Sequence, residues 1–137
     1  MNFNGKHILV TGASSGIGLV AARMLASRGA RVSLLARRKD VLDEVCAAIG
    51  DNAAGFAADV GEKDQLEDAI DAAAGHFGPV EGLFANAGLT GGFTPFLQFD
   101  PAVFEETLRV NLTSVFWAIQ KVLPAMVEAK KGTILVT

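Results

Sequence analysis

Short apolar runs alternate with segments of helical hydrophobic spacing along this sequence, and that alternation constrains the fold more than any other feature. The apolar runs are His7–Thr11, Arg31–Ala36, Ala54–Asp59, Val80–Gly88 and Gly132–Thr137. Strands that alternate with helices are joined by right-handed crossovers, which produce a parallel sheet covered on both faces. The sequence therefore predicts an α/β fold, a doubly wound parallel sheet within a three-layer α/β/α sandwich.

The segments between the first four runs have the spacing expected of three helices. The apolar stripe of the first consists of Ile17, Val20, Ala21, Met24 and Leu25. Gly29 follows where a helix would stop, and Asp40 is placed to cap a second helix over Val41–Ile49. Residues Glu62–Phe77 are amphipathic, with most acidic side chains away from the apolar face.

The second half of the chain predicts a loop, a long helix and a closing strand. Leu89–Phe99 is rich in glycine and proline and is expected to be the loop. Asp100 and Pro101 then supply an N-cap and a proline at the first helical position. Helical spacing continues from Val103 to about Lys130, and Pro124 predicts a kink. The closing GTILVT carries no charge and is expected to be a buried strand.

Composition excludes several classes of protein. The chain has 137 residues, of which 50% are hydrophobic and 20% charged, with a net charge of −3 and no clustering of basic residues suited to nucleic acid. No secretory signal is recognisable, and no apolar run approaches the ~20 residues that span a bilayer. A single cysteine, Cys46, excludes an internal disulfide. His7 and His76 have no acid or nucleophile at readable spacing, so they are assigned no chemistry, and nothing in the sequence supports metal ligation. We expect a cytoplasmic domain without metal, membrane or nucleic-acid partners.

The segment TGASSGIG follows the first predicted strand and opens the first predicted helix. Glycine permits a tight turn there and lets backbone approach a pyrophosphate without Cβ clashes. The N–H groups at a helix N-terminus favour an anion. A turn that is merely rich in small residues is the alternative. The candidate phosphate-binding residues are Thr11, Gly12, Ser14, Ser15, Gly16, Ile17 and Gly18.

Three motifs in order resemble the classical short-chain dehydrogenase/reductase family. They are TGASSGIG, NAG at Asn86–Gly88 after the fourth strand, and VNL at Val110–Leu112 within a later helix. The resemblance extends from Lys6 to Thr137 and implies a Rossmann fold, a nicotinamide cofactor and hydride transfer to or from a carbonyl or alcohol. The family's strand order implies 3-2-1-4-5 for the five strands present here.

The residues after the second strand favour NADP over NAD. The resemblance places Ala36 where an NAD-type enzyme has a carboxylate for the ribose 2′-hydroxyl, and Arg37 and Arg38 follow. Guanidinium groups bind phosphate, which a carboxylate would repel. By resemblance Arg37 binds the 2′-phosphate and Arg38 stacks on or flanks the adenine. The alternatives are a solvated basic turn and a redirected Asp40 that binds the ribose of NAD.

Two further segments are assigned to the cofactor by resemblance. Asp59 corresponds to an acid that accepts from the adenine amino group, and Val60 to an apolar wall beside the ring. Asp59 could instead cap the following turn. In the segment Asn86, Ala87 and Gly88, the backbone passes close to the adenine-side ribose, and the same segment is expected to steady the central sheet.

Asn111 is the one candidate catalytic residue. It follows the apolar stripe Val103, Phe104, Thr107 and Leu108 at helical spacing, and an amide on a core-facing stripe must find hydrogen-bond partners. A satisfied core asparagine is the ordinary explanation. The resemblance implies instead a member of an Asn-Ser-Tyr-Lys tetrad that holds a water in a proton relay.

The rest of that tetrad cannot be placed in the sequence. The chain contains no tyrosine, Ser114 lies on the wrong element, and the candidate lysines precede the last strand. We therefore expect residues 1–137 to be a single cofactor-binding domain, incomplete at its C-terminus, that is inactive alone. Its full-length parent would act on a small carbonyl or alcohol. The alternatives are a non-catalytic NADP-binding module and a dimerisation module; in any case we expect a homo-oligomer through the 111–130 helix.

Overall fold

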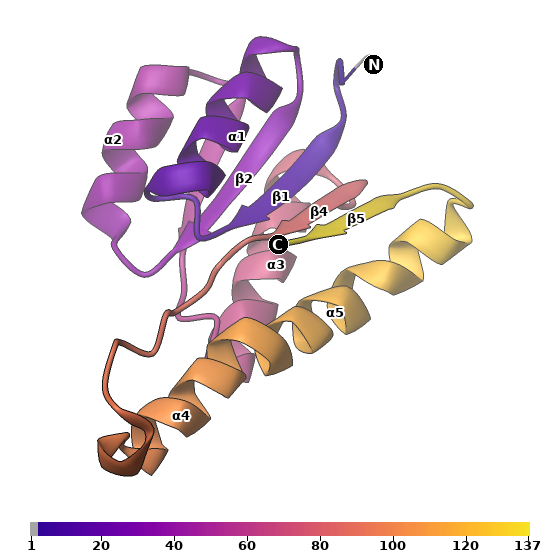
Figure 1. The fold of residues 1–137 in the computed structure, drawn as a ribbon. Coiled ribbons are helices and arrows are strands. Elements are labelled where there is room, and N and C mark those ends of the chain that lie inside the picture. The colour runs from indigo at the N-terminus through magenta and orange to yellow at the C-terminus, as the bar shows by residue number, and fades with distance from the viewer. Residues whose placement is uncertain (1–2) are drawn as a thin grey trace.

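The structure, a computed structural model, describes residues 3–137 and contains one parallel five-stranded sheet. The strand order is β3-β2-β1-β4-β5, which confirms the expected doubly wound topology. Figure 1 shows the sheet twisting between helices on its two faces. The strands are β1 His7–Thr11, β2 Arg31–Ala36, β3 Ala53–Ala57, β4 Gly82–Ala85 and β5 Thr133–Val136.

Helices cover both faces of the sheet, but not evenly. Helices α1 and α2 pack over β1, β2 and β3, whereas α3 and α5 pack against each other on the opposite face (Figure 1). The helices are α1 Gly16–Ser27, α2 Lys39–Ile49, α3 Lys63–Phe77, α4 Pro101–Leu108 and α5 Ser114–Glu128. A single 3-10 turn, Phe96–Gln98, lies in the loop before α4, and residues Arg109–Thr113 form a π-helical turn between α4 and α5.

Each face of the sheet has its own apolar core. On the α1–α2 side, Val32 and Leu34 of β2 are fully buried together with Leu42 of α2. On the other side, Leu9 of β1 and Leu66 of α3 are fully buried. Successive strand residues point to opposite faces, so a sheet covered on both faces needs continuous apolar strands. The burial of every residue of β1 and β4 agrees with that requirement.

Only part of the apolar stripe predicted for α1 packs on the sheet, because Ala21 and Leu25 contact the α1–α2 core while the other three residues are exposed. Ile17, Val20 and Met24 are 68%, 56% and 49% exposed, whereas Gly18, Ala22 and Ala26 are buried. Small side chains at Gly18, Ala22 and Ala26 let this helix lie close to the strands. Hydrophobicity alone ranks isoleucine and methionine above glycine and alanine, which explains why the predicted stripe is centred away from the residues that are fully buried.

Helix starts were predicted with mixed success. Asp100 caps α4 as expected, because its Oδ1 accepts from the N–H of Ala102 at 2.9 Å. Asp40 is not an N-cap: α2 begins at Lys39, and Asp40 lies in its first turn. The long helix is broken by the π turn at Arg109–Thr113, while α5 continues through Pro124.

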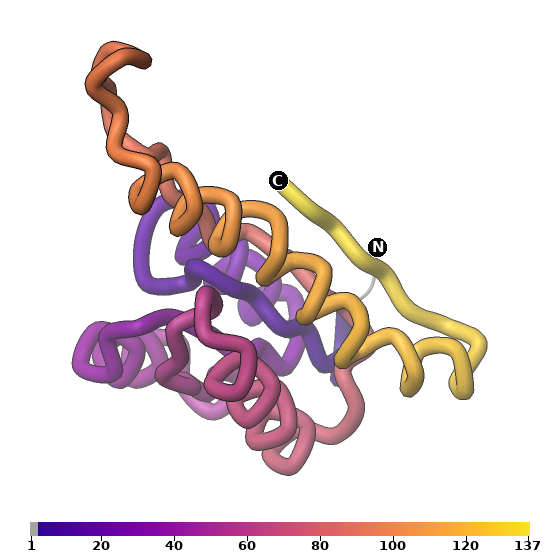
Figure 2. Tube along the Cα trace, turned by 90° about the horizontal axis from the view of Figure 1, so that it is seen from below, coloured from indigo at the N-terminus to yellow at the C-terminus, as the bar shows by residue number. Residues whose placement is uncertain are grey.

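The closing strand β5 is not the buried strand that its sequence predicts. Leu135 and Val136 are 55% and 49% exposed, and only Ile134 packs against the α3–α5 core. Figure 2 shows β5 running alongside α5 at the margin of the molecule. Position at the edge of the sheet therefore overrides an apolar composition.

The helical stretch Pro101–Glu128 is, among residues 3–137, the one that is long and apolar enough to cross a bilayer by length and composition. The expectation that no apolar run approaches that length thus needs correction, because the mean hydropathy of this helix stays high despite its few polar residues. Only 28% of its most apolar stretch is buried, so this helix is packed along one side alone. Here Ala118, Val122 and Met126 are buried against the sheet and α3.

Candidate cofactor-binding site

A cleft of about 360 Å³ lies at the carboxyl ends of the strands. It opens beside β1 and β4, the neighbouring strands between which the strand order of the sheet reverses. Most of the predicted cofactor-binding residues line it, while Thr11, Gly18 and Arg38 do not; nor does Asn111, the candidate catalytic residue. The predicted residues in the cleft are Gly12, Ser14, Ser15, Gly16, Ile17, Arg37, Asp59, Val60, Asn86, Ala87 and Gly88.

The glycine turn before α1 forms the floor of this cleft. Gly12 and Gly16 have φ of +66° and +56°, a conformation that favours glycine. A Cβ on Gly12 would lie 2.9 Å from the Cα of Ala87, so the turns after β1 and β4 touch backbone to backbone. Ser15 is the N-cap of α1, and its side chain makes no capping hydrogen bond within the described residues. The first N–H groups of α1 are therefore open to an anion.

Thr11, at the end of β1, connects the turn after β1 to the turn after β4 by hydrogen bonds. Its Oγ1 accepts hydrogen bonds from the backbone N–H groups of Asn86 and Ala87, each at 3.0 Å. In return, Nδ2 of Asn86 donates to the carbonyl oxygens of Thr11 and Gly12, at 3.2 and 3.4 Å. Thr11 is only 4% exposed. This residue fixes the shape of the cleft without lining it.

The two arginines after β2 occupy different positions. Arg37 lines the cleft, whereas Arg38 is the N-cap of α2 and lies outside it. Neither guanidinium makes an ion pair with any residue of the described chain, 3–137. Arg37 is thus a free cation beside the end of β2.

Asp59 caps the turn after β3, which is the structural alternative to its predicted role in cofactor binding. Its Oδ1 accepts from the N–H of Gly61 at 2.9 Å, which caps the turn after β3. Its own N–H donates to Oε1 of Gln65 at 3.0 Å. Val60 beside it is buried and lines the cleft. One carboxylate oxygen of Asp59 is therefore committed to the turn.

Asn111 does not lie on a core-facing stripe. Phe104 and Leu108 on that stripe are 54% and 43% exposed, and Asn111 itself is exposed. Its amide instead clamps Leu89, because Oδ1 accepts from the Leu89 N–H and Nδ2 donates to the Leu89 carbonyl, both at 2.7 Å. Asn111 therefore fixes the start of the loop that follows β4.

The structure adds Glu106 on α4 to the residues that line the cleft. Glu106 lies one helical turn before Val110, which is buried and also lines the cleft. That spacing from the VNL motif is visible in the sequence and could have identified Glu106. Ala36, which the resemblance places beside the ribose, also lines the cleft, whereas the lining residues Ala58 and Leu89 carry no such signal.

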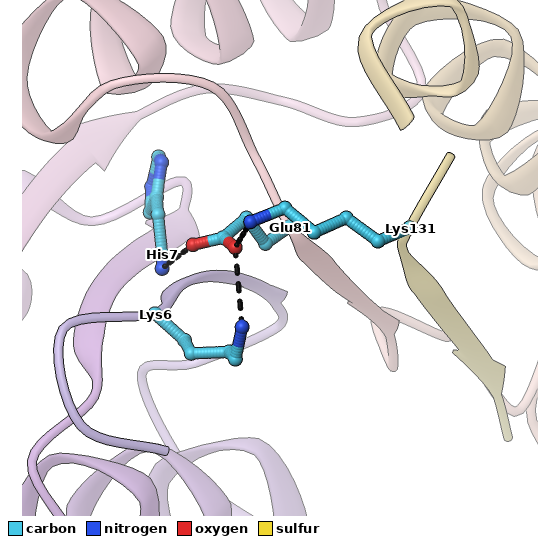
Figure 3. Close-up of polar contacts among 4 residues, drawn as sticks. All are labelled: Lys6, His7, Glu81 and Lys131. Atoms are coloured by element: carbon cyan, nitrogen blue, oxygen red, sulfur yellow. Dashed lines mark hydrogen bonds and ion pairs between the residues drawn. The ribbon is translucent and has the colours of Figure 1, made fainter. Parts of the chain in front are cut away.

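A second polar cluster lies at the opposite, amino-terminal ends of the strands (Figure 3). Oε1 of Glu81 accepts from Nζ of Lys131 at 2.9 Å and from Nζ of Lys6 at 3.3 Å. Its Oε2 accepts from the backbone N–H of His7 at 3.3 Å. The hydrogen bond from Lys131 is the main reason that the pKa of Glu81 falls from 4.5 to about 2. This cluster connects β1, β4 and the segment before β5.

His7 is buried beside that cluster and is structural. Its Nδ1 donates to the carbonyl oxygen of Gly78 at 2.7 Å, and its Nε2 accepts from the hydroxyl of Ser33 at 2.8 Å. Burial lowers the pKa of His7, which favours this neutral form. Within residues 3–137 no group of three or more metal-ligating side chains is gathered.

Comparison with known proteins relates the chain to one family. A profile of the family described as short chain dehydrogenase matches residues 6–137. Levodione reductase from Leifsonia aquatica is 34% identical over 140 residues, which cover 98% of this chain and 52% of that protein. The 3-oxoacyl-[acyl-carrier-protein] reductase FabG of Vibrio cholerae is 35% identical, with 98% and 55% covered.

Solved structures show the same likeness. The 3-ketoacyl-(acyl-carrier-protein) reductase from Brucella melitensis, determined as a complex with NADH, superposes with a TM-score of 0.91 at 31% identity. The match covers 96% of this chain and 56% of that one. This chain thus spans about half the length of the relatives it matches.

Proposed function

Because this chain belongs to the short-chain dehydrogenase family, we propose that it is the cofactor-binding part of an NADP-dependent oxidoreductase that interconverts a carbonyl and an alcohol. The observation that carries this proposal is the cleft itself, which gathers the glycine turn, the start of α1 and Arg37 around one volume. Gly12 packs against the backbone of Ala87 too closely for any Cβ, whereas a Cβ on Gly16 would meet no atom of the described residues within 4 Å, so the glycine turn keeps the approach to the start of α1 open for a pyrophosphate.

Different residues of the cleft would bind different parts of the cofactor. The open N–H groups at the start of α1, with Ser14 and Ser15, would hold the pyrophosphate. Arg37 would bind the 2′-phosphate of the adenosine ribose, with Arg38 flanking the adenine. Asp59 and Val60 would bind the base, and the Asn86–Gly88 backbone would pass beside the ribose. When bound, the nicotinamide supplies the hydride that is exchanged with substrate carbon.

Catalysis would need residues beyond those of this chain. In this family the proton is supplied by a tyrosine, and the sequence contains none. Ser114 is buried and its Oγ donates to the Val110 carbonyl at 2.6 Å, while Lys121 pairs with Asp71 at 2.8 Å. We therefore propose that residues 1–137 form one binding domain that does not turn over substrate alone. Asn111 would contribute by holding Leu89 in place, and its part in a proton relay stays a prediction.

The choice between NADP and NAD is tested by titrating the folded chain with NADPH and with NADH and following nicotinamide fluorescence. We expect NADPH to bind at least tenfold more tightly, since charge-assisted hydrogen bonds from a guanidinium to phosphate contribute about 1.5–3 kcal/mol. Arg37→Glu should remove the preference by weakening NADPH binding. The control is Arg28→Glu, the same charge change at the C-terminal end of α1, away from the cleft.

Two results would count against the proposal. Equal affinity for NADPH and NADH in the wild-type chain would contradict the NADP preference while leaving a dinucleotide site intact. Failure of both to bind would contradict the cofactor-binding function itself. The NADH complex of the Brucella relative makes the NADH arm of the titration necessary.

A further inference from the structure

A tight turn over residues 3–6 precedes β1 and contains the one Asn-Gly pair of the sequence, Asn4 and Gly5. The N–H of Lys6 donates to the carbonyl oxygen of Phe3 at 2.9 Å, which closes the turn. Gly5 has a φ of +71°, the conformation that the third residue of a type II turn requires. Asn4 and Gly5 are both exposed, so water reaches the pair.

This turn is attached to the glycine turn at the end of α1. The N–H of Gly5 donates to the carbonyl oxygen of Gly29 at 2.8 Å, and the N–H of Arg31 donates to the carbonyl oxygen of Lys6 at 2.9 Å. Asn4 lies so close to Gly29 that a Cβ on Gly29 would be 2.8 Å from Oδ1 of Asn4. These contacts connect the segment before β1 to the start of β2.

An asparagine that precedes glycine can react with its own backbone. The nitrogen of Gly5 forms a bond to Cγ of Asn4, the bond from Cγ to Nδ2 breaks, and the proton of Gly5 leaves with the ammonia. Water then opens the five-membered imide at either carbonyl, which gives aspartate or isoaspartate. Glycine favours closure of the ring because it has no Cβ. A Cβ on Gly5 would meet no atom of residues 3–137 within 4 Å, so none of them crowds that side of the ring.

The folded turn restrains this reaction. The attacking nitrogen of Gly5 is held by its hydrogen bond to Gly29, and the same glycine turn fixes Asn4. Closure of the imide ring requires that both contacts open. Surface turns open locally at a lower cost in free energy than the whole fold. The rate of modification therefore follows the fraction of molecules in which the turn has separated from Gly29.

We propose that Asn4 is a site of spontaneous deamidation, that its contact with Gly29 sets the rate, and that the isoaspartate product detaches the turn from the start of β2. Isoaspartate carries its side-chain carbon within the main chain, so the turn becomes longer by one backbone carbon. The hydrogen bonds of Gly5 and Lys6 to the Gly29–Arg31 segment then cannot both keep their geometry. This inference is independent of the proposed cofactor function.

The test follows Asn4 by mass spectrometry of the peptide of residues 1–6 that trypsin releases, with fragment ions that separate Asn4 from Asn2. The chain is incubated at mildly alkaline pH, both folded and unfolded in urea. We expect Asn4 to be modified in both, at least about fivefold more slowly in the folded chain, since one hydrogen bond confers that protection. Asn4→Gln should give no product in the same period, because glutamine must close a larger ring. The asparagines that precede larger residues should stay intact; they are Asn52, Asn86 and Asn111.

Gly29→Ala tests the contact that restrains Asn4. The added Cβ would overlap Oδ1 of Asn4, so the rate in the folded chain should rise several-fold towards the rate in urea. The matched control is Gly50→Ala. Gly50 lies at the end of α2 with a φ of +95°, against +87° for Gly29, but a Cβ there would meet no atom of the described chain within 4 Å. Both changes strain the backbone alike, so the rate in Gly50→Ala should stay at the wild-type value.

The consequence is measured on the isoaspartate form after chromatographic separation. Hydrogen exchange at the N–H of Arg31 should be faster in that form than in the unmodified chain, and unchanged exchange would refute the proposed detachment. Absence of modification at Asn4 even in urea would show that the site is wrong. Equal rates in the folded and unfolded chain, or in Gly29→Ala and Gly50→Ala, would refute the role of Gly29. Circular dichroism confirms that each variant is folded.

Discussion

At the scale of single residues, the cleft depends on contacts that leave no room for a side chain. Gly18 faces the turn after β1, and a Cβ there would overlap the carbonyl oxygen of Gly12 and lie 2.7 Å from Nδ2 of Asn86. Gly18 does not line the cleft, so its role is to let α1 approach the Gly12 turn. The glycine spacing in the sequence indicated such a contact, but it could not separate the residues that line the cleft from those that support it.

Gly18→Ala should therefore destabilise the protein and weaken cofactor binding. We expect a loss of about 1–3 kcal/mol in the free energy of unfolding, the usual cost of inserting a methyl group where there is no space, measured by urea denaturation. The control is Gly75→Ala in α3, where a Cβ would meet nothing within 4 Å. That change should stabilise the chain by about 0.5–1 kcal/mol, as alanine does in a helix. Equal stability of the two variants would contradict the contact assigned to Gly18.

At the scale of elements, the sequence predicted the existence and order of the strands and helices better than their buried faces. The alternating pattern is a local property, so β1 and β2 were predicted to the residue. The face of α1 that packs depends on how closely it approaches the sheet, and the exposure of β5 depends on its place at the edge. Both are tertiary properties. Asp40 likewise is a residue type that favours the N-cap position, but α2 begins two residues too early for it.

Glu81 connects the amino-terminal ends of β1, β4 and β5. Its carboxylate binds Lys6 and Lys131, and its backbone carbonyl oxygen accepts from the N–H of Thr133 at 3.1 Å. Few side chains of β5 pack against the core, because it is an exposed edge strand. The contacts of Glu81 therefore supply much of what attaches the start of β5 to the sheet. The cluster was not predicted, since Lys6, Glu81 and Lys131 are far apart in the sequence.

Glu81→Gln should reduce stability in a pH-dependent manner. Folding lowers the pKa of Glu81 from 4.5 to about 2, so its contribution is fully present above pH 4.5 and is lost as the pH falls towards 2. At pH 7 we expect a loss of about 1–2 kcal/mol, moderated by the exposure of both lysines. Urea denaturation of both proteins between pH 7 and pH 2 measures it, and the difference should shrink across that window.

A surface ion pair provides the comparison for Glu81. Asp43 pairs with Lys39 at 2.6 Å on α2, where both side chains are mostly exposed. Asp43→Asn should cost at most about 0.5 kcal/mol. If Glu81→Gln costs no more than Asp43→Asn, or if its effect is independent of pH, the role of Glu81 at this junction is refuted.

At the scale of the whole molecule, the chain exposes more surface than a compact monomer of its size. Its accessible surface is 8001 Å² at a mass of 14.3 kDa, whereas a globular monomer of that mass exposes about 6,800 Å². The loop before α4 projects from the rest of the molecule in Figure 2. A stripe of exposed apolar side chains on the π turn and α5 adds to the accessible surface. The stripe consists of Leu112, Phe116, Leu123 and Val127, which are 65%, 61%, 42% and 65% exposed.

This excess surface predicts that the 137-residue chain self-associates through the outer face of the 111–130 helix. The excess of about 1,200 Å² exceeds the ~800 Å² that each partner buries in a standard interface. The stripe follows helical spacing, so one helix face presents all four side chains to a second copy.

Light scattering should give a mass above that of the monomer, and Leu112→Glu with Phe116→Glu should return it to the monomer value. The control is Leu135→Thr with Val136→Thr, which removes the exposed apolar groups of β5 and leaves β-branched residues with high strand propensity at both positions. If the β5 variant dissociates while the helix variant stays associated, copies meet at the open edge of the sheet instead.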